Sequence, residues 1–183
     1  MRVITGQFKG RRLTTVPDRT IRPVTDRVKQ TIFDSLATRL DLQDTQVLDL
    51  FAGTGSLGIE ALSRGAKHCT FVDSSDQGIT CIRQNLNTLG CFPAATVVQM
   101  DAFRFIDECR DQFALIFADP PYSYAETSRI PSAVFSRNLL EPSGYLLIEH
   151  TKNMIFEESP LTRLDVVKKF GSTFVSFYVH KVS

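Results

Sequence analysis

The sequence predicts an α/β protein in which an open, mostly parallel β-sheet carries helices on both faces. From residue 46 onward, short apolar runs of strand length alternate with segments whose apolar residues recur at helical spacing. A glycine-rich turn joins the first strand-like run to the first helix-like segment. After residue 160 the pattern changes to two runs separated by Gly171, which predicts a closing antiparallel hairpin.

The elements of the alternating region follow from these runs. The runs QVLDL, HCTFVD, ATVVQ, FALIFA and GYLLIE predict strands near residues 46–50, 68–73, 95–99, 113–118 and 144–149. The segments between them predict helices near residues 56–64, 75–89, 102–110 and 130–139. Strands that are joined through helices are expected to run parallel to one another.

The first 45 residues do not follow this alternation. Two short runs, residues 3–5 and 11–13, flank the turn-forming Gly6 and Gly10 and predict a small hairpin. A proline-bounded loop over residues 17–23 comes next.

A helix is then expected to begin at Thr25 or Asp26. The Asp26 side chain can accept hydrogen bonds from free backbone N–H groups, and one helix face is apolar, formed by Val28, Ile32, Phe33 and Leu36. We divide the chain into a basic N-terminal extension, residues 1–40, and a main domain, residues 41–183.

Charge is distributed unevenly between these two parts. Residues 1–40 hold nine Lys or Arg against three Asp, a net charge of +6, whereas the other 143 residues hold twelve basic and seventeen acidic residues, a net charge of −5. A basic end on an acidic body indicates a polyanionic partner such as a nucleic acid. The alternative is a solvated surface whose charges bind nothing specific.

Other classes of site find no support in the sequence. The four cysteines form no CxxC pair and have no histidines clustered beside them, so no metal site or disulfide framework is expected. Basic residues interrupt the N-terminus, and no apolar run approaches the ~18 residues of a membrane span. We expect a cytoplasmic monomer with reduced thiols and no membrane contact.

The glycine-rich turn Gly53-Thr54-Gly55-Ser56-Leu57-Gly58 matches a nucleotide-binding pattern. It follows a predicted strand and opens a predicted helix, and Asp73 stands twenty residues beyond Gly53, where a carboxylate can bind ribose hydroxyls. This pattern alone does not separate a nicotinamide enzyme from a methyltransferase that uses S-adenosylmethionine (AdoMet).

Asp49 favours AdoMet. It lies just before the turn, where a carboxylate would repel a pyrophosphate but attract the ammonium and sulfonium cations of AdoMet. Asp101, directly after the third strand, is placed to bind the adenine. Alternatively, Asp49 is a structural acid and Asp101 caps the helix that begins at residue 102.

Asp119-Pro120-Pro121-Tyr122 follows the fourth strand and indicates methylation of an amino group on a base. The Asp119 carboxylate and the Pro120 carbonyl can accept hydrogen bonds from an exocyclic amine, and the prolines make the turn stiff. Tyr122 offers a face on which an extruded base can stack. A proline pair can also simply end a strand, but its position in this fold favours chemistry. Carbon methylation would need a cysteine nucleophile here, and no cysteine lies nearby.

The chain resembles the bacterial RsmD family, which methylates the N2 amino group of one guanine in 16S ribosomal RNA. The resemblance rests on MRVITGQFKGRRL, RPVTDRVKQTIFDSL, VLDLFAGTGSLGIEALSRGA, FADPPY and FGSTFVSFY. It implies a Rossmann-like class I methyltransferase with a seven-stranded sheet, AdoMet as cofactor, and an N-terminal extension that helps to hold RNA. One departure is Asp73, where many relatives are expected to have Glu.

The resemblance assigns residues to three roles. The catalytic clamp is Asp119, Pro120, Pro121 and Tyr122. The AdoMet-binding residues are Asp49, Phe51, Ala52, Gly53, Thr54, Gly55, Asp73, Ser74, Asp101 and Ala102. The RNA-binding residues, which would contact phosphates, are Lys9, Arg11, Arg12, Arg22, Arg27 and Lys29. Alternatively, Arg22, Thr25, Asp26 and Arg27 form a structural clasp on the cofactor side.

The resulting hypothesis is AdoMet-dependent methylation of guanine N2 in 16S ribosomal RNA, acting on the RNA or on a partly assembled small subunit. The runner-up is an adenine N6 methyltransferase of DNA or RNA, because the clamp fits that amine equally well. A nicotinamide- or nucleotide-binding module and a small-molecule amine methyltransferase are weaker alternatives. The choice of guanine rests on the resemblance.

Overall fold

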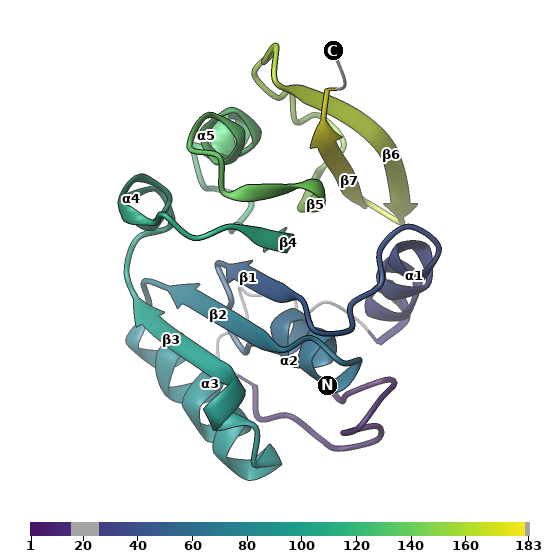
Figure 1. Ribbon diagram of the computed structural model, residues 1–183, viewed down its shortest axis with the longest axis vertical. Coiled ribbons are helices and arrows are strands. Elements are labelled where there is room, and N and C mark those ends of the chain that lie inside the picture. The colour runs from purple at the N-terminus through teal and green to yellow at the C-terminus, as the bar shows by residue number, and fades with distance from the viewer. Residues whose placement is uncertain (16–25, 182–183) are drawn as a thin grey trace.

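The computed structural model describes residues 1–15 and 26–181. Its centre is one seven-stranded sheet with the order β3-β2-β1-β4-β5-β7-β6 (Figure 1). The strands are β1 (Gln46–Leu50), β2 (His68–Asp73), β3 (Ala95–Gln99), β4 (Phe113–Ala118), β5 (Leu140–Thr151), β6 (Thr162–Phe170) and β7 (Thr173–His180). The helices are α1 (Asp26–Ala37), α2 (Ser56–Ser63), α3 (Asp76–Leu89), α4 (Ala102–Glu108) and α5 (Ile130–Ser136), with 3-10 turns η1 (Phe92–Ala94) and η2 (Thr127–Arg129).

The direction of the strands confirms the expected α/β class with a closing hairpin. Strands β1 to β5 pair in parallel, whereas β7 runs antiparallel to both β5 and β6. The parallel strands are joined by crossovers that each contain a helix, but β6 and β7 are joined by a tight turn at Gly171, whose φ is 61°. Such a short turn permits only antiparallel pairing.

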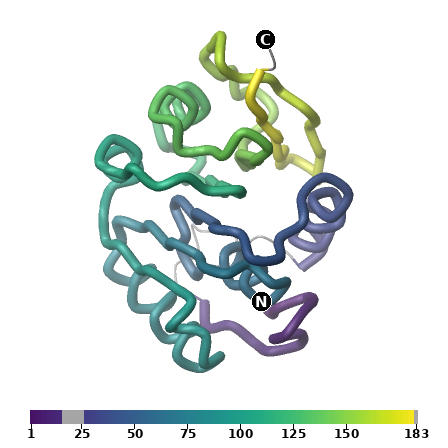
Figure 2. Tube along the Cα trace, viewed as in Figure 1, coloured from purple at the N-terminus to yellow at the C-terminus, as the bar shows by residue number. Residues whose placement is uncertain are grey.

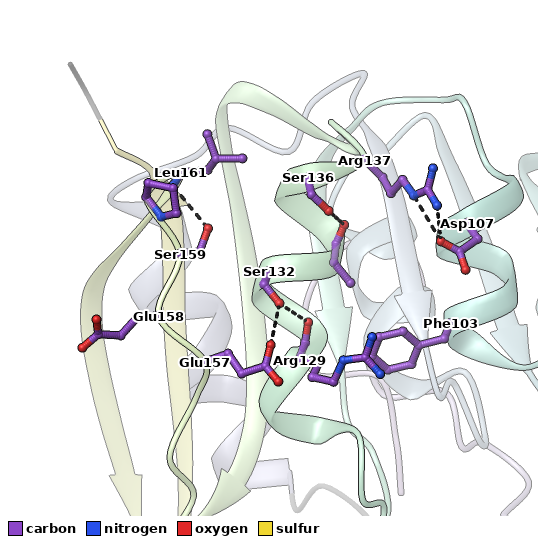
Figure 3. Close-up of a pocket in the computed structure, with 12 residues that line it drawn as sticks. Phe103, Asp107, Arg129, Ser132, Ser136, Arg137, Glu157, Glu158, Ser159 and Leu161 are labelled. Carbon is purple, nitrogen blue, oxygen red and sulfur yellow. Dashed lines mark hydrogen bonds and ion pairs between the residues drawn. The ribbon is translucent and has the colours of Figure 1, made fainter.

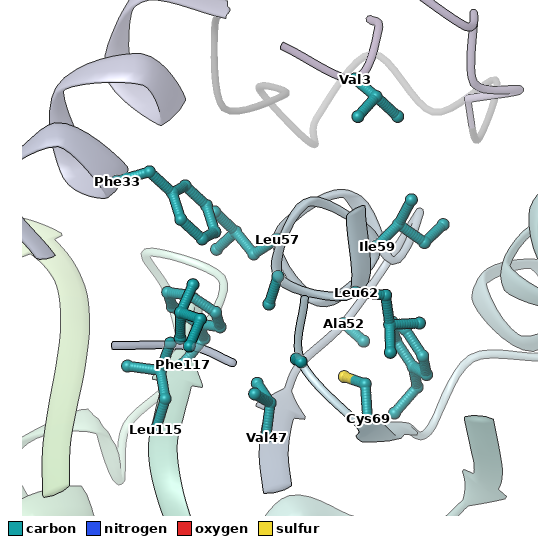
Figure 4. Close-up of a cluster of buried hydrophobic side chains, with 14 of the residues drawn as sticks. Val3, Phe33, Val47, Ala52, Leu57, Ile59, Leu62, Cys69, Leu115 and Phe117 are labelled. Atoms are coloured by element: carbon teal, nitrogen blue, oxygen red, sulfur yellow. The ribbon is translucent and has the colours of Figure 1, made fainter. Parts of the chain in front are cut away.

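The sheet is buried on both faces. Successive residues of a strand point to opposite faces, so the continuous apolar run of β4 contributes to two cores. Leu115 and Phe117 pack with α1, α2 and α3, whereas Ile116 and Ala118 pack with α4 and α5. Figure 4 shows Phe33 of α1 close to Phe117, and their ring centroids are 5.6 Å apart.

The boundary between α5 and β5 differs from the expectation. The helix ends at Ser136 and the strand begins at Leu140, several residues before 144. Asn138 takes a φ of 56°, which ends the helical path, and Leu140 already pairs with Phe113 at the start of β4. Pairing with the neighbouring strand therefore overrides the local pattern.

Residues 1–15 fold back on themselves as a small, irregular hairpin, in agreement with the expected one. One antiparallel bridge joins Arg2 to Arg12, and the Val3 amide donates to the Arg11 carbonyl at 2.9 Å. The backbone of this segment also bonds to α2, and three of its side chains are buried in the core of α1, α2 and α3: Val3, Phe8 and Leu13. The trace in Figure 2 runs along the outside of the helical layer.

Within residues 1–15 and 26–181, no helix is both long and apolar enough to cross a membrane. In the same ranges, no group of three or more His, Cys, Asp or Glu side chains is placed to hold a metal ion. The expected loop over residues 17–23 and the expected helix start at Thr25 lie outside the described residues.

Candidate active site

Four neighbouring strands present a carboxylate at the same edge of the sheet. Asp73 ends β2, Asp49 lies one residue before the end of β1, Asp119 follows β4, and Glu149 lies near the end of β5. The chain proceeds outward from β1 through β2 to β3 and then returns to β4 on the other side of β1. The strand order therefore reverses between β1 and β4, which is where open parallel sheets bind ligands.

Three of these carboxylates lie on one face of the sheet. Asp49 stands between two residues of β1 that pack against α4 and α5, so its side chain points the other way, towards α2. Asp119 and Glu149 follow Ala118 and Ile148, which are paired in parallel register and also pack against α4 and α5. Strand alternation therefore brings Asp119 and Glu149 to the face that holds Asp49.

Asp49 is buried against the first turn of α2. Its Oδ2 accepts a hydrogen bond from the Gly58 amide at 2.9 Å, so it satisfies a free N–H group of that helix. Burial raises the pKa of Asp49 to about 8, and the nearby charge of Asp73 adds to the effect. Asp49 therefore has a structural role at α2. Because it uses only one of its acceptor sites there, it can accept further hydrogen bonds from a bound cation.

The loop between β1 and α2 depends on glycine at close contacts. Phe51, Gly53 and Gly55 all have positive φ, of 57°, 55° and 75°. A Cβ atom at Gly58 would lie 2.4 Å from the Phe71 ring of β2, so only glycine lets α2 approach the sheet this closely. The three positive φ values make the loop, which also includes Ala52 and Thr54, tightly curved.

Asp73 holds this loop in place. Its Oδ2 accepts from the Gly53 amide at 2.7 Å, and its Oδ1 accepts from the Ser75 amide at 2.8 Å. Each carboxylate oxygen can accept a second hydrogen bond, which leaves capacity for a ribose hydroxyl. Ser74, next to it, is exposed.

Asp101 caps α4, as one of its two expected roles requires. Its Oδ1 accepts from the Phe103 and Arg104 amides at 2.9 and 3.1 Å. Its Oδ2 receives a longer contact, 3.4 Å, from the hydroxyl of Tyr124, whose ring meets Phe51 edge-on at a centroid distance of 4.9 Å. Ala102 is buried beside it.

The Asp119–Tyr122 turn leaves β4 directly beside the loop. The Asp119 amide points to the Leu50 carbonyl at the end of β1, at 3.4 Å. Pro120 is buried, whereas Pro121 and Tyr122 are exposed. The Tyr122 side chain is 52% exposed, and its hydroxyl lies 2.9 Å from Thr173 Oγ1. An aromatic face is therefore open next to the turn.

Asp119 is held in a negative environment. Burial raises its pKa well above the ordinary value, and the charges of Glu149 and Asp49 raise it further. Like charges at close range disfavour ionisation of all of them at once. A positive group bound at this edge would relieve the repulsion.

Lys29 corrects the expectation that it contacts RNA phosphates. Its side chain is completely buried, and Nζ lies 3.3 Å from Glu60 Oε2 on α2 and 2.7 Å from the Arg2 carbonyl. Burial lowers the pKa of Lys29, although the Glu60 carboxylate opposes that shift. Its spacing on α1 places it on the face that packs inward, where no phosphate can reach it.

The other basic residues differ in their surroundings. Lys9, Arg11, Arg12 and Arg27 are exposed, and Arg11 donates to the Thr88 carbonyl at 2.9 Å. Arg22 lies outside the described residues, as does Thr25 of the considered clasp. Asp26, another member of the considered clasp, pairs with Arg2 at 2.9 Å.

Sequence reasoning missed Glu149, Glu60 and Tyr124. Glu149 is the last residue of the run GYLLIE, so the sequence indicated its place near a strand end, but its neighbours depended on strand order. Glu60 lies in α2, whose residues are all buried. An acid in such an apolar helix indicates that a positively charged partner is buried beside it.

Two pockets lie away from this edge. One, of about 460 Å³, is lined by α4, α5 and residues 157–161, and Figure 3 shows Arg137 paired with Asp107 there. Arg129, also in its lining, pairs with Glu126. The other, of about 640 Å³, lies beside residues 5–7 and 62–67. Neither includes the carboxylates of β1, β4 and β5.

Comparison with known proteins identifies the family. The family model described as conserved hypothetical protein 95 matches residues 1–179. The chain is 34% identical to ribosomal RNA small subunit methyltransferase D of Haemophilus influenzae, over 84% of this chain and 80% of that protein, and 36% identical to the Escherichia coli protein of the same name, over 81% and 71%. The solved Escherichia coli structure named "Putative methyltransferase yhhF" is 30% identical, with a TM-score of 0.87 over 100% of this chain and 99% of that one. The chain belongs to the RsmD family of methyltransferases.

Proposed function

We propose that this protein transfers the methyl group of AdoMet to the N2 amino group of a guanine in 16S ribosomal RNA. The observation that carries the proposal is the position of the Asp119–Tyr122 turn, beside the glycine loop and on the sheet face of Asp49. This juxtaposition supports the proposal, because the proposed amine acceptor and the proposed cofactor loop are adjacent. The relatives named small subunit methyltransferase D support ribosomal RNA as the substrate.

The residues around the loop suit AdoMet. Asp49 is buried among negative charges, so an ammonium or sulfonium group would compensate a charge that the protein leaves poorly balanced. Asp73 would hold the ribose, and Asp101 and Ala102 would border the adenine. AdoMet supplies a methyl group on a positively charged sulfur. The proposed cofactor site comprises Asp49, Phe51, Ala52, Gly53, Thr54, Gly55, Asp73, Ser74, Asp101 and Ala102.

The chain's own contribution is to orient the amine. The lone pair of an exocyclic amine is delocalised into the base, so the nitrogen must be polarised while it faces the methyl group. A carboxylate oxygen of Asp119 and the Pro120 carbonyl accept hydrogen bonds from its two N–H groups, and the rigid prolines fix both acceptors in advance. The exposed Tyr122 ring stacks on the extruded base.

The extension, residues 1–40, is proposed to hold the RNA through phosphates. Lys9, Arg11, Arg12 and Arg27 remain the proposed contacts within the described residues, because their side chains are exposed. Lys29 is withdrawn from this set. Arg22 stays a proposal from the sequence.

The test is to map the modified nucleotide. Ribosomal RNA from cells with and without the protein is digested to nucleosides, and the proposal expects N2-methylguanosine only where the protein is present. N6-methyladenosine in its place would establish the adenine alternative. Calorimetry separates the nicotinamide alternative, since we expect binding of AdoMet at roughly micromolar Kd and none of NAD.

A further inference from the structure

The C-terminal hairpin brings three lysines to the edge of the sheet that holds the Asp119–Tyr122 turn. Strands β5 and β6 both end at this edge, since the last residue of each pairs with Thr173, the first residue of β7. Lys152 follows β5 directly, and Lys168 and Lys169 lie in the last three residues of β6. We call the two segments that meet here, residues 150–155 and 166–175, the hairpin edge.

The hairpin edge adjoins the proposed base-stacking tyrosine. The Tyr122 hydroxyl lies 2.9 Å from Thr173 Oγ1. Neighbouring strands run ~4.8 Å apart, so the ends of β5 and β6 each lie about one strand spacing from Thr173. An RNA strand with one base stacked on Tyr122 would therefore carry its neighbouring phosphates close to the hairpin edge.

The charge of the hairpin edge is opposite to that of the main domain. Its two segments contain three lysines and no Asp or Glu, a net charge of +3, whereas residues 41–183 together carry −5. No ion pair within residues 1–15 and 26–181 involves any of these three lysines. The acid that precedes them on β6, Asp165, pairs with Arg39 and Arg163. The lysine charges are therefore available to an anionic partner.

The two lysines of β6 present their charge on both faces of the sheet. Lys168 pairs in register with Val175, which is buried on the side of α1 and α2. Lys169 pairs with Phe174 and points to the opposite face, where its Nζ lies 6.0 Å from the centroid of the Phe174 ring, within the range of a cation–π contact. Lys152 and Lys169 are exposed, and Lys168 is half-buried.

The hairpin edge lies at the same end of the molecule as the start of α1. Lys29 Nζ lies 3.4 Å from the hydroxyl of Ser56, the first residue of α2, so the first turn of α1, with Arg27, is near the glycine loop. Figure 1 shows the end of β6 beside α1, and Arg39, which follows α1, pairs with Asp165 of β6. The proposed phosphate contact Arg27 and the three lysines are thus near the same edge of the sheet.

We propose that the hairpin edge is a second RNA-binding surface, on which Lys152, Lys168 and Lys169 contact phosphates of the strand whose base stacks on Tyr122. A lysine binds phosphate as a point charge and does not read the bases, so this surface holds the RNA without selecting the nucleotide. The N-terminal extension holds other phosphates of the same RNA. This inference rests on the proposed function for the identity of the polyanion.

The first experiment compares two variants that lose the same charge. The edge variant combines Lys152→Gln, Lys168→Gln and Lys169→Gln. The control variant removes three exposed basic residues at the opposite edge of the sheet, where β2 and β4 begin and β7 ends: Lys67→Gln, Arg110→Gln and Lys181→Gln. Calorimetry with AdoMet should give the same affinity for both variants and for the unmodified protein, which also reports that they are folded.

Binding of a 16S ribosomal RNA transcript is then measured at several salt concentrations. The edge variant should bind about tenfold more weakly, and its slope of log affinity against log salt should be smaller by about 2 to 3, as expected for three lost phosphate contacts. The control variant should differ little from the unmodified protein. Equal losses in the two variants, or an unchanged slope in the edge variant, would overturn the proposal.

A single replacement covers the case in which the edge variant fails to bind AdoMet. Lys152→Gln changes a turn residue outside the strands and should reduce the salt slope by about 1. An unchanged slope in this variant would then overturn the proposal.

The second experiment measures single-turnover methyl transfer to the same RNA across RNA concentrations. In the edge variant the half-saturating concentration should rise about tenfold, while the rate at saturation stays within about twofold, because the lysines do not contact the amine. A half-saturating concentration equal to that of the control variant would refute the hairpin edge as an RNA contact. Absence of both RNA binding and methyl transfer in the unmodified protein would instead refute the proposed function.

Discussion

Two buried acids on the same side of the sheet, Glu60 of α2 and Asp49 of β1, differ in how their charges are compensated. Glu60 lies within salt-bridge distance of Lys29 and Arg64, at 3.3 and 2.9 Å, and also accepts the amides of Ile4 and Thr5. Asp49 accepts one hydrogen bond, from the Gly58 amide, and the nearby charge of Asp73 is negative.

This difference separates structure from function. The neutralised acid fixes the N-terminal segment and α1 onto α2, so its charge is already compensated within the fold. Burial and neighbouring carboxylates raise the pKa values of Asp49 and Asp119, so these two acids favour a proton or a bound cation. Carboxylates of the second kind mark the site, and the following predictions test that contrast.

Removing the charge of Asp119 should have the largest effect on activity. Asp119→Asn keeps the shape but weakens the acceptor for the amine, so the rate of methyl transfer should fall about 10³-fold. AdoMet affinity, measured by calorimetry, should change little. Full turnover in this variant would contradict the assigned clamp.

Breaking the buried ion pair between Lys29 and Glu60 should have the largest effect on the free energy of unfolding. Lys29→Met leaves Glu60 buried beside fewer positive charges and should lower the free energy of unfolding by about 3–5 kcal/mol, measured by urea denaturation. The control is Arg104→Gln, which removes an exposed pair with Glu108 and should leave the unfolding free energy nearly unchanged. Equal stability of the two variants would refute the contrast between buried and exposed pairs.

AdoMet binding should depend on pH through Asp49. Its pKa of about 8 means that a cation must displace a proton at lower pH, so affinity should fall up to tenfold per unit below about pH 8. The amino group of AdoMet also titrates near pH 8, so the comparison with Asp49→Asn isolates the protein's share. Calorimetry in buffers of different ionisation heat should detect proton release only with Asp49 present.

The same pKa makes a statement about stability. Because the folded-state pKa of Asp49 lies above its ordinary value of 3.8, its contribution to folding is present at low pH and is lost as pH rises towards about 8. The stability of Asp49→Asn relative to the unmodified protein should therefore rise as pH increases towards about 8. A stability difference that is constant between pH 5 and pH 9 would contradict the shifted pKa.

The smallest effect concerns the exposed basic residues. Arg11→Glu combined with Arg12→Glu should weaken RNA binding several-fold and reduce the dependence of log affinity on log salt by about 2. Arg110→Glu, at an exposed residue just after α4 and outside the proposed RNA contacts, is the control and should leave both unchanged. A small-molecule methyltransferase would lose no activity in the double variant.

The sequence by itself determined most helices and strands and the residues that follow the strands at the edge of the site. Apolar periodicity placed β1 to β4 at their observed bounds, and the Asp119–Tyr122 turn could be assigned to a strand end, because these patterns depend on residues that are close in the chain. The glycine loop likewise follows from local backbone requirements.

Only the tertiary structure decided which charged side chains form ion pairs within the fold and which do not. Lys29 had the same local appearance as the other basic residues of the extension, yet α1 turns it towards Glu60, 31 positions away in the chain. Glu149 became a neighbour of Asp119 because β5 pairs with β4. Burial and strand order are long-range properties, so the balance of charge that separates Glu60 from Asp49 cannot be derived from local patterns.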